Sequence, residues 1–232
     1  MNCINYNIED IINIFNGFEP IYYGCFTEYE AEYFIDDFID LEHFSFEMGA
    51  TKLVLIPKKE DYVIKVPFTG YFDGGTPEDG DYISFYGAEF GNGEDSCQSE
   101  IEFYNKIKNS NFKQLFMPLE KIGEYKGVPI YIQPKCETLI EGEENFIYSS
   151  EKDRKRIKEE AEKDSSQAKE PVFAALPISW VASLLTVLKD YKELVKFYSF
   201  LRKHDFGYDL HIANVGYYNN HAVILDYGGY NS

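Results

Sequence analysis

Basic residues are scarce in this sequence. Its 232 residues include 22 Lys and Arg against 40 Asp and Glu, which gives a formal net charge of -18 at pH 7. Nucleic-acid phosphates and anionic membrane surfaces are bound mainly through Lys and Arg, so this balance argues against both as partners. One acidic alternative stays open, which is a decoy that presents carboxylates in place of phosphates to a nucleic-acid-binding protein.

Cysteine is also scarce. None of the four cysteines belongs to a C-x-x-C pair or has a histidine at ligand spacing, so neither a zinc site nor a disulfide framework is supported. The N-terminus lacks the basic and apolar regions of a secretory signal. We therefore expect reduced thiols in a cytoplasmic protein, of the producing cell or of a host cell. The cysteines are Cys3, Cys25, Cys97 and Cys136.

Long apolar runs are missing as well. The most apolar segment, Val172 to Leu188, is interrupted by Pro177, Ser179 and Ser183. It is therefore predicted to be a buried helix rather than a membrane span. The hydrophobic content of 44% indicates a folded chain, long enough for one large domain or for two small lobes around a cleft.

The first 45 residues have the pattern of two helices. We predict one helix from Ile8 to Phe15 after an Asn7 cap, and a second from Glu28 to Phe44. Thr27 and Glu30 have the spacing of a capping box at the start of the second helix. Its many acidic residues are interpreted as a solvated face rather than a partner-docking surface.

Strand periodicity begins at Phe44 and alternates with helical segments later in the chain. Residues 68–97 are rich in Gly and Asp and are predicted to form an inserted loop. Residues 151–164 are predicted to form a charged, exposed helix. The predicted strands are 44–57, 62–67, 117–125 and 128–133, the last two joined by a Lys126-Gly127 turn, and the remaining predicted helices are 98–108, 178–188 and 192–202.

Two polar clusters flank a predicted hairpin near the C-terminus. The apolar run 222–225 is typical of a buried strand, and Tyr217-Tyr218 is its predicted partner across an Asn-Asn turn. Asp209 and Asn214 precede this hairpin and Asp226 follows it. Two carboxylates and an amide in this arrangement suit the binding of Mg²⁺ on a nucleotide phosphate and the orientation of an attacking hydroxyl.

These residues resemble the catalytic and metal-binding loops of the protein-kinase-like superfamily. The segment from Asp209 to Asn214 is similar to the D-L-x-x-x-N part of the kinase catalytic loop, and Asp226-Tyr-Gly228 is similar to the D-F-G motif. The resemblance implies that Asp209 accepts or orients the proton of the acceptor hydroxyl. It also implies that Asn214 and Asp226 hold Mg²⁺ beside ATP.

The strand around Lys65 extends the resemblance toward the N-terminus. Val63-Ile-Lys65 is similar to the family's V-A-I-K, in which the lysine holds the α and β phosphates of the nucleotide. A glutamate on the next helix pairs with that lysine in the family. Glu100 is the better match for this glutamate, and Glu102 is the alternative.

Two further segments would contact the nucleotide if the resemblance holds. The turn that begins at Gly49 would cover the phosphates, with Gly49 and Thr51 as contacts, although it has one glycine where protein kinases have three. The segment from Gln133 to Glu137 corresponds to the hinge that meets adenine. Because Pro134 has no N–H, the contacts there would be the carbonyl of Gln133 and the amide of Lys135 or Cys136.

The predicted fold class is α+β, with the two-lobed arrangement of a protein kinase. Residues 1–45 would form a helical extension, 46–133 an antiparallel-sheet N-lobe with the inserted loop 68–97, and 134–232 a short, mainly helical C-lobe. The sequence ends shortly after Gly228, without the segments that bind peptide in ordinary protein kinases. In this it resembles the minimal kinases of bacterial effectors and phages.

The function implied is transfer of the γ-phosphate of ATP to a hydroxyl of a protein substrate, with Mg²⁺ as cofactor. Three alternatives stay open. A catalytically weak pseudokinase is suggested by the single glycine and by Gly207 and Tyr208, which replace the family's His and Arg. An acidic binding or inhibitor protein is suggested by the net charge. A small-molecule kinase of the aminoglycoside phosphotransferase type is suggested by His211.

Overall fold

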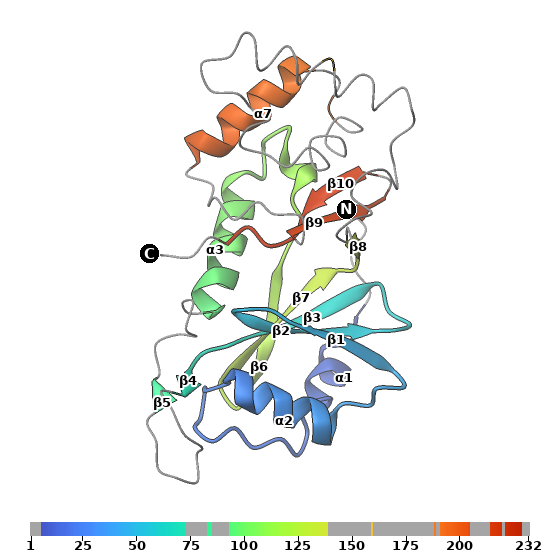
Figure 1. Ribbon diagram of the computed structural model, residues 1–232, viewed down its shortest axis with the longest axis vertical. Helices are drawn as coiled ribbons and strands as arrows, with labels where there is room; N and C mark the ends of the chain where they lie inside the picture. Colours follow the sequence, from blue (N-terminus) through green and yellow to red (C-terminus); the bar gives the residue numbers. More distant parts are fainter. Residues whose placement is uncertain are drawn as a thin grey trace. The chain divides into compact units, whose positions relative to one another are not determined.

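The computed structural model describes residues 6–72, 83–84, 93–138, 159, 188, 191–204, 214–219 and 221–228 (Figure 1). These residues form an α+β protein, as predicted, with a five-stranded antiparallel sheet and a few helices. The chain divides into two compact units. The first comprises the residues up to Phe103 together with Pro118–Lys135 and Tyr230–Ser232, and the second comprises Tyr104–Met117 and Cys136–Gly229.

The helices of the described ranges are α1 (Ile8–Asn13), α2 (Glu28–Phe38), α3 (Gly93–Lys106), the 3-10 helix η2 (Lys113–Leu115) and α7 (Tyr191–Lys203). The strands are β1 (Phe44–Met48), β2 (Lys52–Pro57), β3 (Tyr62–Pro67), β4 (Tyr71–Phe72), β5 (Ile83–Ser84), β6 (Glu120–Tyr125), β7 (Val128–Pro134), β8 (Glu137–Thr138), β9 (Val215–Tyr218) and β10 (His221–Ile224). No described helix combines the length and the apolar character that a membrane crossing needs.

The sheet of the first unit has the strand order β1-β2-β3-β7-β6, and every neighbouring pair is antiparallel. A tight turn joins β1 to β2, where the amide of Gly49 donates to the carbonyl of Lys52 at 3.0 Å. The predicted Lys126-Gly127 turn joins β6 to β7. Both of its residues have positive φ, 49° and 82°, which suits the type I′ turn that hairpins favour.

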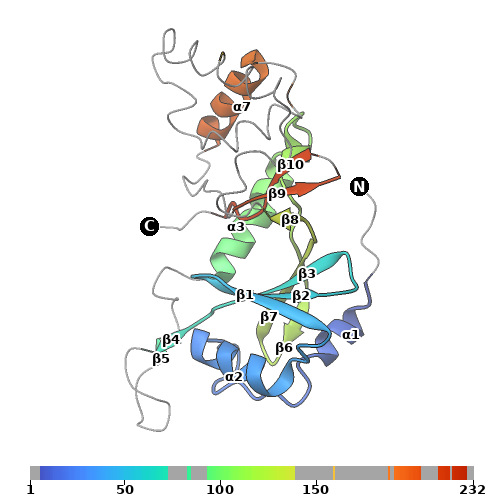
Figure 2. The same cartoon turned by 45° about the vertical axis from the view of Figure 1, so that its right-hand side comes forward.

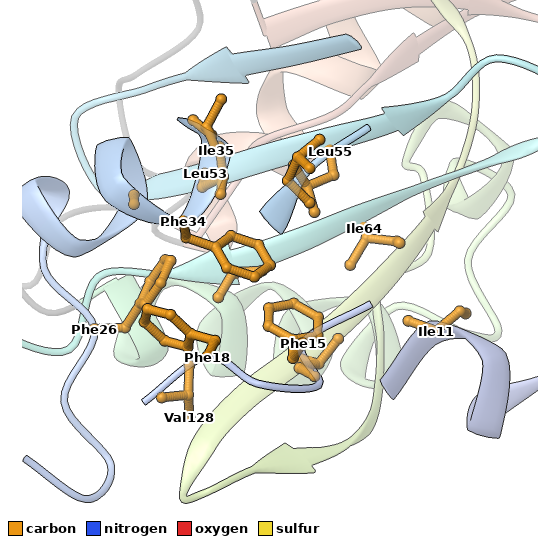
Figure 3. Packing of buried hydrophobic residues seen from close by; sticks show 14 of the residues in the cluster. Ile11, Phe15, Phe18, Phe26, Phe34, Ile35, Leu53, Leu55, Ile64 and Val128 are labelled. Atoms are coloured by element: carbon orange, nitrogen blue, oxygen red, sulfur yellow. The ribbon is translucent and has the colours of Figure 1, made fainter. Parts of the chain in front are cut away.

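One face of this sheet is covered by α1 and α2 (Figures 1 and 2). Every second residue of β2, β3 and β7 points to that face, where phenylalanines from the N-terminal segment pack against it (Figure 3). The rings of Phe15 and Phe34 are stacked, with centroids 4.8 Å apart. Burying each such ring contributes roughly 1.5 to 3 kcal/mol of hydrophobic free energy, so the helical segment is integral to the first unit.

The predicted capping box of α2 is confirmed. The amide of Glu30 donates to Thr27 Oγ1 at 3.1 Å, and the amide of Thr27 donates to Glu30 Oε2 at 2.9 Å. The predicted end of the helix at Phe44 is wrong, because α2 ends at Phe38. Asp40 accounts for the difference, since its side chain accepts the amide of Glu42 at 2.8 Å and so offers the backbone a local turn in place of the helix.

Two other predicted helix boundaries differ from those in the structure. The first helix, α1, begins after the predicted Asn7 cap but ends at Asn13, and the chain continues in single turns to Gly17, whose φ is 93°. The helix predicted from Gln98 begins five residues earlier, at Gly93, so the predicted insertion 68–97 is shorter than expected. The sequence indicated a loop at Gly93, but in the structure this residue begins α3. A Cβ there would lie 2.1 Å from the carbonyl oxygen of Thr51, so glycine is needed for this close approach.

The second unit contains the predicted C-terminal hairpin, formed by β9 and β10 in antiparallel register with His221 opposite Tyr218. Strand β8 was not predicted, and it adds a third strand beside β9. The helix predicted from 192 to 202 is confirmed as α7, and its Phe197 packs its ring against Phe112 and Phe116.

The strand predicted from Met117 begins at Glu120 as β6. Met117 is part of the second unit instead, because its amide donates to the carbonyl of Ile224 in β10 at 2.9 Å. The predicted helices 151–164 and 178–188 lie outside the described residues, apart from Glu159 and Leu188.

Candidate functional site

Lys65 lies on the sheet face that is turned away from the phenylalanine core. Its neighbours in β3, Ile64 and Val66, belong to that core, and side chains alternate between the two faces of a strand. Lys65 is opposite Val54 of β2 and Tyr131 of β7, so these three side chains form a row across three strands. Only 5% of Lys65 is exposed, which is rare for a lysine and marks this face as polar and enclosed.

Glu100 of α3 is fully buried in the first unit. Its Oε1 lies 3.3 Å from Nζ of Lys52, the first residue of β2. Lys52 precedes Val54 by two residues, so its side chain is on the same face as the row that contains Lys65. The ion pair that the structure shows for Glu100 is thus with Lys52, which the sequence did not single out.

The spacing of buried residues in α3 explains why Glu100 is enclosed. Gly93, Ser96, Cys97 and Glu100 are buried and recur at the three- and four-residue intervals of one helix face. Cys97 packs against Tyr131 of the sheet. Glu102, the alternative to Glu100, is exposed, and its side chain accepts a hydrogen bond from Gln98.

Tyr131 places a buried hydroxyl on this face of the sheet. The residue is fully buried, and its hydroxyl has no hydrogen-bond partner within the described part of the chain. Burial, reinforced by the neighbouring Cys97, raises the pKa of Tyr131 well above its ordinary value of 10.0. The hydroxyl therefore stays protonated and keeps its capacity to donate.

The turn predicted to cover the phosphates is short and closely packed. Gly49 and Ala50 are exposed, whereas Thr51 is 7% exposed. The carbonyl of Thr51 accepts the amide of Phe68 at 2.8 Å, which fixes the turn against the segment after β3. Among the described residues, a Cβ on Gly49 would meet only the carbonyl of Lys52, at 3.7 Å.

The predicted adenine contacts fall at the end of β7. Gln133 is buried and lies opposite Val63. The amide of Lys135 donates to the carbonyl of Asp61 at 2.8 Å, and its side chain donates to the carbonyl of Pro57. The amide of Lys135 therefore has an acceptor within the chain. The adenine contacts of Gln133 and of Lys135 or Cys136 stay predictions.

In the second unit, Asn214 and Asp226 lie at the open end of the β9–β10 hairpin. The last pair of the hairpin is Val215 with Ile224, and the amide of Leu225 donates to the carbonyl of Asn214 at 2.9 Å. The backbones at Asn214 and Asp226 are thus brought together across the hairpin, although the residues are twelve apart in sequence.

Asp226 is held between two fixed neighbours. On one side Leu225 is bonded to Asn214. On the other side the hydroxyl of Tyr227 donates to the carbonyl of Met117 at 2.6 Å, and its ring meets Phe116 edge to face at 5.2 Å. Asp226 itself is half-buried.

The predicted catalytic residue Asp209 lies outside the described residues, as do Gly207, Tyr208 and His211. Helix α7, which leads toward that segment in the chain, is described to its end at Lys203.

The oxygen atoms of Asn214 and Asp226 fit Mg²⁺, which prefers a small number of carboxylate and carbonyl ligands together with water and phosphate. Within the described ranges, no three side chains of His, Cys, Asp or Glu gather as a ready metal site.

Sequence reasoning missed Lys52 and Tyr131. The signal for Lys52 was available, because a strand residue two positions before Val54 must share its face. The signal for Tyr131 depended on pairing β7 with β3, which no local pattern in the sequence specifies.

Compared with models of protein families, with curated proteins and with solved structures, the chain has no significant match.

Proposed function

We propose that this protein is an ATP-dependent phosphotransferase with a two-lobed, protein-kinase-like fold, which transfers the γ-phosphate of ATP to a hydroxyl of a protein substrate in the cytoplasm. The observation that carries the proposal is the enclosed polar face of the first unit. Lys65 is 5% exposed there, and Glu100 is fully buried. A buried lysine on this strand and a buried glutamate on the next helix are the residue types that the resemblance assigns to phosphate binding.

The second unit supports the same proposal independently. Asn214 and Asp226 converge at one end of a hairpin, with the oxygen ligands that Mg²⁺ prefers. The resemblance in sequence assigns phosphate binding to Lys65 and Mg²⁺ binding to Asn214 and Asp226.

In the proposed reaction, the hydroxyl oxygen of the acceptor attacks the γ-phosphorus of ATP. The bond from the γ-phosphorus to the bridging oxygen breaks, ADP leaves with the electron pair, and the hydroxyl proton passes to the carboxylate of Asp209. Lys65 would neutralise the charge on the phosphates and orient them. Asn214 and Asp226 would hold Mg²⁺, whose chemistry is further neutralisation of phosphate charge.

The test incubates purified protein with radiolabelled ATP and Mg²⁺, with and without a cell lysate. The wild-type protein is expected to label itself or a lysate protein. Asp226→Ala and Asp209→Asn should each reduce labelling by on the order of a hundredfold or more. Asp37→Ala, which changes an exposed carboxylate of α2, is the matched control and should label like the wild type. Equal labelling by Asp209→Asn and wild type would rule out the catalytic role of Asp209.

A pseudokinase is a second candidate, and the ion pair of Glu100 with Lys52 favours it. A carboxylate held by a second lysine need not orient the lysine that holds the phosphates in the family. A pseudokinase that binds Mg-ATP should gain thermal stability from it but label nothing in the same assay.

A further inference from the structure

Helix α7 presents a row of exposed lysines in the second unit. Lys192, Lys196 and Lys203 are exposed, and intervals of four and seven residues place them on one side of a helix. Phe197 and Leu201 are buried on the other side. We call the three lysines the lysine face of α7.

The segment around η2 extends this basic surface. Residues 103–119 contain no Asp or Glu, and the ring of Phe112 in this segment packs against two phenylalanines of α7. Burial lowers the pKa of His204, just after α7, and Lys106 and Lys203 lower it further. Lys106, which is exposed, therefore lies close to the lysine face and enlarges it.

No carboxylate of the described residues pairs with these lysines. The ion pairs within the described ranges all involve groups other than Lys106 and the lysine face, although the whole chain has a net charge of -18. A surface of one sign attracts a partner of the opposite sign. A nucleic acid is disfavoured as this partner, because it would extend beyond the lysines over the acidic remainder of the chain. We therefore expect a partner that presents a short row of carboxylates.

Helix α2 of the first unit has such a row. Glu28, Glu32 and Asp36 are exposed and recur at four-residue intervals on one side of the helix, and we call them the acidic face of α2. The chain has no Lys or Arg before β2. The sequence alone favoured a solvated face here, but Tyr29 and Tyr33 of the same helix are 49% and 48% exposed. Exposed tyrosine rings are side chains that protein interfaces favour, and they also attract lysine ammonium groups.

We propose that the acidic face of α2 in one copy of this protein binds the lysine face of α7 in a second copy. The two rows match in length, because α2 has 11 residues and α7 has 13, which makes the helices about 16 and 20 Å long. Each copy has one face of each kind, so association can close in a two-fold dimer or continue from copy to copy. The inference is independent of the proposed phosphotransfer.

Salt should affect this association in two opposing ways. The net charge of -18 makes two copies repel each other at long range. At about 0.15 M salt the screening length is about 8 Å, which removes most of this repulsion but leaves part of the attraction between carboxylates and ammonium groups in contact. At about 1 M salt the screening length falls to about 3 Å, and the attraction is weakened as well. Two short helices bury little area, so the association is weak and reversible.

The experiment measures the mass of the full chain by analytical ultracentrifugation as a function of protein concentration, at about 0.15 M and about 1 M salt. Circular dichroism verifies folding, which substitutions at exposed positions usually preserve. The double variants are Lys196→Glu/Lys203→Glu, which reverses the lysine face, Glu32→Lys/Asp36→Lys, which reverses the acidic face, and Lys58→Glu/Lys59→Glu, a control in the exposed turn between β2 and β3. The control changes the net charge by the same amount as the first variant.

The wild type is expected to associate increasingly with concentration at the lower salt and to dissociate at the higher. Each face reversal should weaken association by about tenfold or more, because it places like charges opposite each other, whereas the control should associate like the wild type. An equimolar mixture of the two reversed variants should associate again, since each altered face then meets a complementary one. A wild type that is monomeric at both salts overturns the inference. Association that both reversals leave unchanged, or a folded mixture that stays monomeric, overturns it as well, and the labelling assay for phosphotransfer is unaffected by any of these results.

Discussion

At the scale of single residues, the buried hydroxyl of Tyr131 affects the free energy of unfolding. It is buried beside Cys97 without a hydrogen-bond partner in the described part of the chain, so the folded state bears a desolvation cost with no compensating bond. Tyr131→Phe is therefore expected to leave the free energy of unfolding unchanged or to raise it by up to about 1 kcal/mol. Urea denaturation measures this directly. A loss of more than about 1 kcal/mol would show that the hydroxyl has an acceptor.

Glu30 gives a pH-dependent prediction at the same scale. Burial raises the pKa of Glu30 above its ordinary value of 4.5, although hydrogen bonds from Ile21 and Thr27 act in the opposite direction. The folded state therefore holds this proton to higher pH than the unfolded state. The stabilisation from protonated Glu30 is complete below pH 4.5. It is lost as the pH rises through the pKa that Glu30 has in the folded state.

The measurement compares the free energy of unfolding of the wild type with that of Glu30→Gln from pH 4.5 upward. We expect the wild type to lose stability relative to the variant over this range, because only the wild type has the titrating group. Taking the difference cancels the titration of all other residues. If the wild type gains stability relative to the variant instead, the three hydrogen bonds to the carboxylate outweigh its burial.

At the scale of elements, the start of α3 depends on Gly93. A Cβ at this position would lie 2.1 Å from the carbonyl oxygen of Thr51 and 2.9 Å from the amide of Phe68, both of them backbone atoms that cannot move aside alone. Gly93→Ala should lower the free energy of unfolding by about 1 to 3 kcal/mol. Gly49→Ala is the matched control, because its nearest contact would be at 3.7 Å, and it should change stability by less than about 0.5 kcal/mol. Similar effects of the two substitutions in urea denaturation would contradict this packing.

Elements defined by local signals could be predicted from the sequence. The capping box at Thr27, the hairpin near the C-terminus and helix α7 each follow from residues close together in the chain, whose spacing determines the structure. The end of α2 could not be predicted by periodicity, because a side-chain bond of Asp40 competes with the helix. Strand β8 is defined by its pairing with β9, so local sequence could not predict it.

The candidate site was predictable to a similar degree. The convergence of Asn214 and Asp226 follows from a local hairpin. The ion pair of Lys52 with Glu100 depends on where α3 crosses the sheet, and this is decided by tertiary packing around Gly93 and Cys97. The amide of Lys135 donates to the carbonyl of Asp61, a contact beside the ends of two strands that no sequence pattern predicts.

At the scale of the whole molecule, the proposed nucleotide would bind only the folded chain. Mg-ATP should therefore raise the melting temperature, since a ligand at a hundred times its dissociation constant adds about 2.7 kcal/mol to stability. Asp226→Ala should lose the part of this increase that depends on Mg²⁺, whereas Asp209→Asn should retain it. Differential scanning fluorimetry with ATP, with and without Mg²⁺, makes the comparison. No change in melting temperature at millimolar nucleotide would count against both the enzyme and the nucleotide-binding pseudokinase.

The N-terminal helices have a consequence for how the protein is made. The amide of Gly24 bonds to the carbonyl of Lys126, and the hydroxyl of Tyr6 bonds to Glu120. Neither contact can form until the ribosome has synthesised about a hundred further residues, which takes on the order of 5 to 20 s. For this interval the phenylalanines of the first forty residues lack the part of their core that β7 supplies. Chaperones that bind aromatic segments therefore have time to act on them.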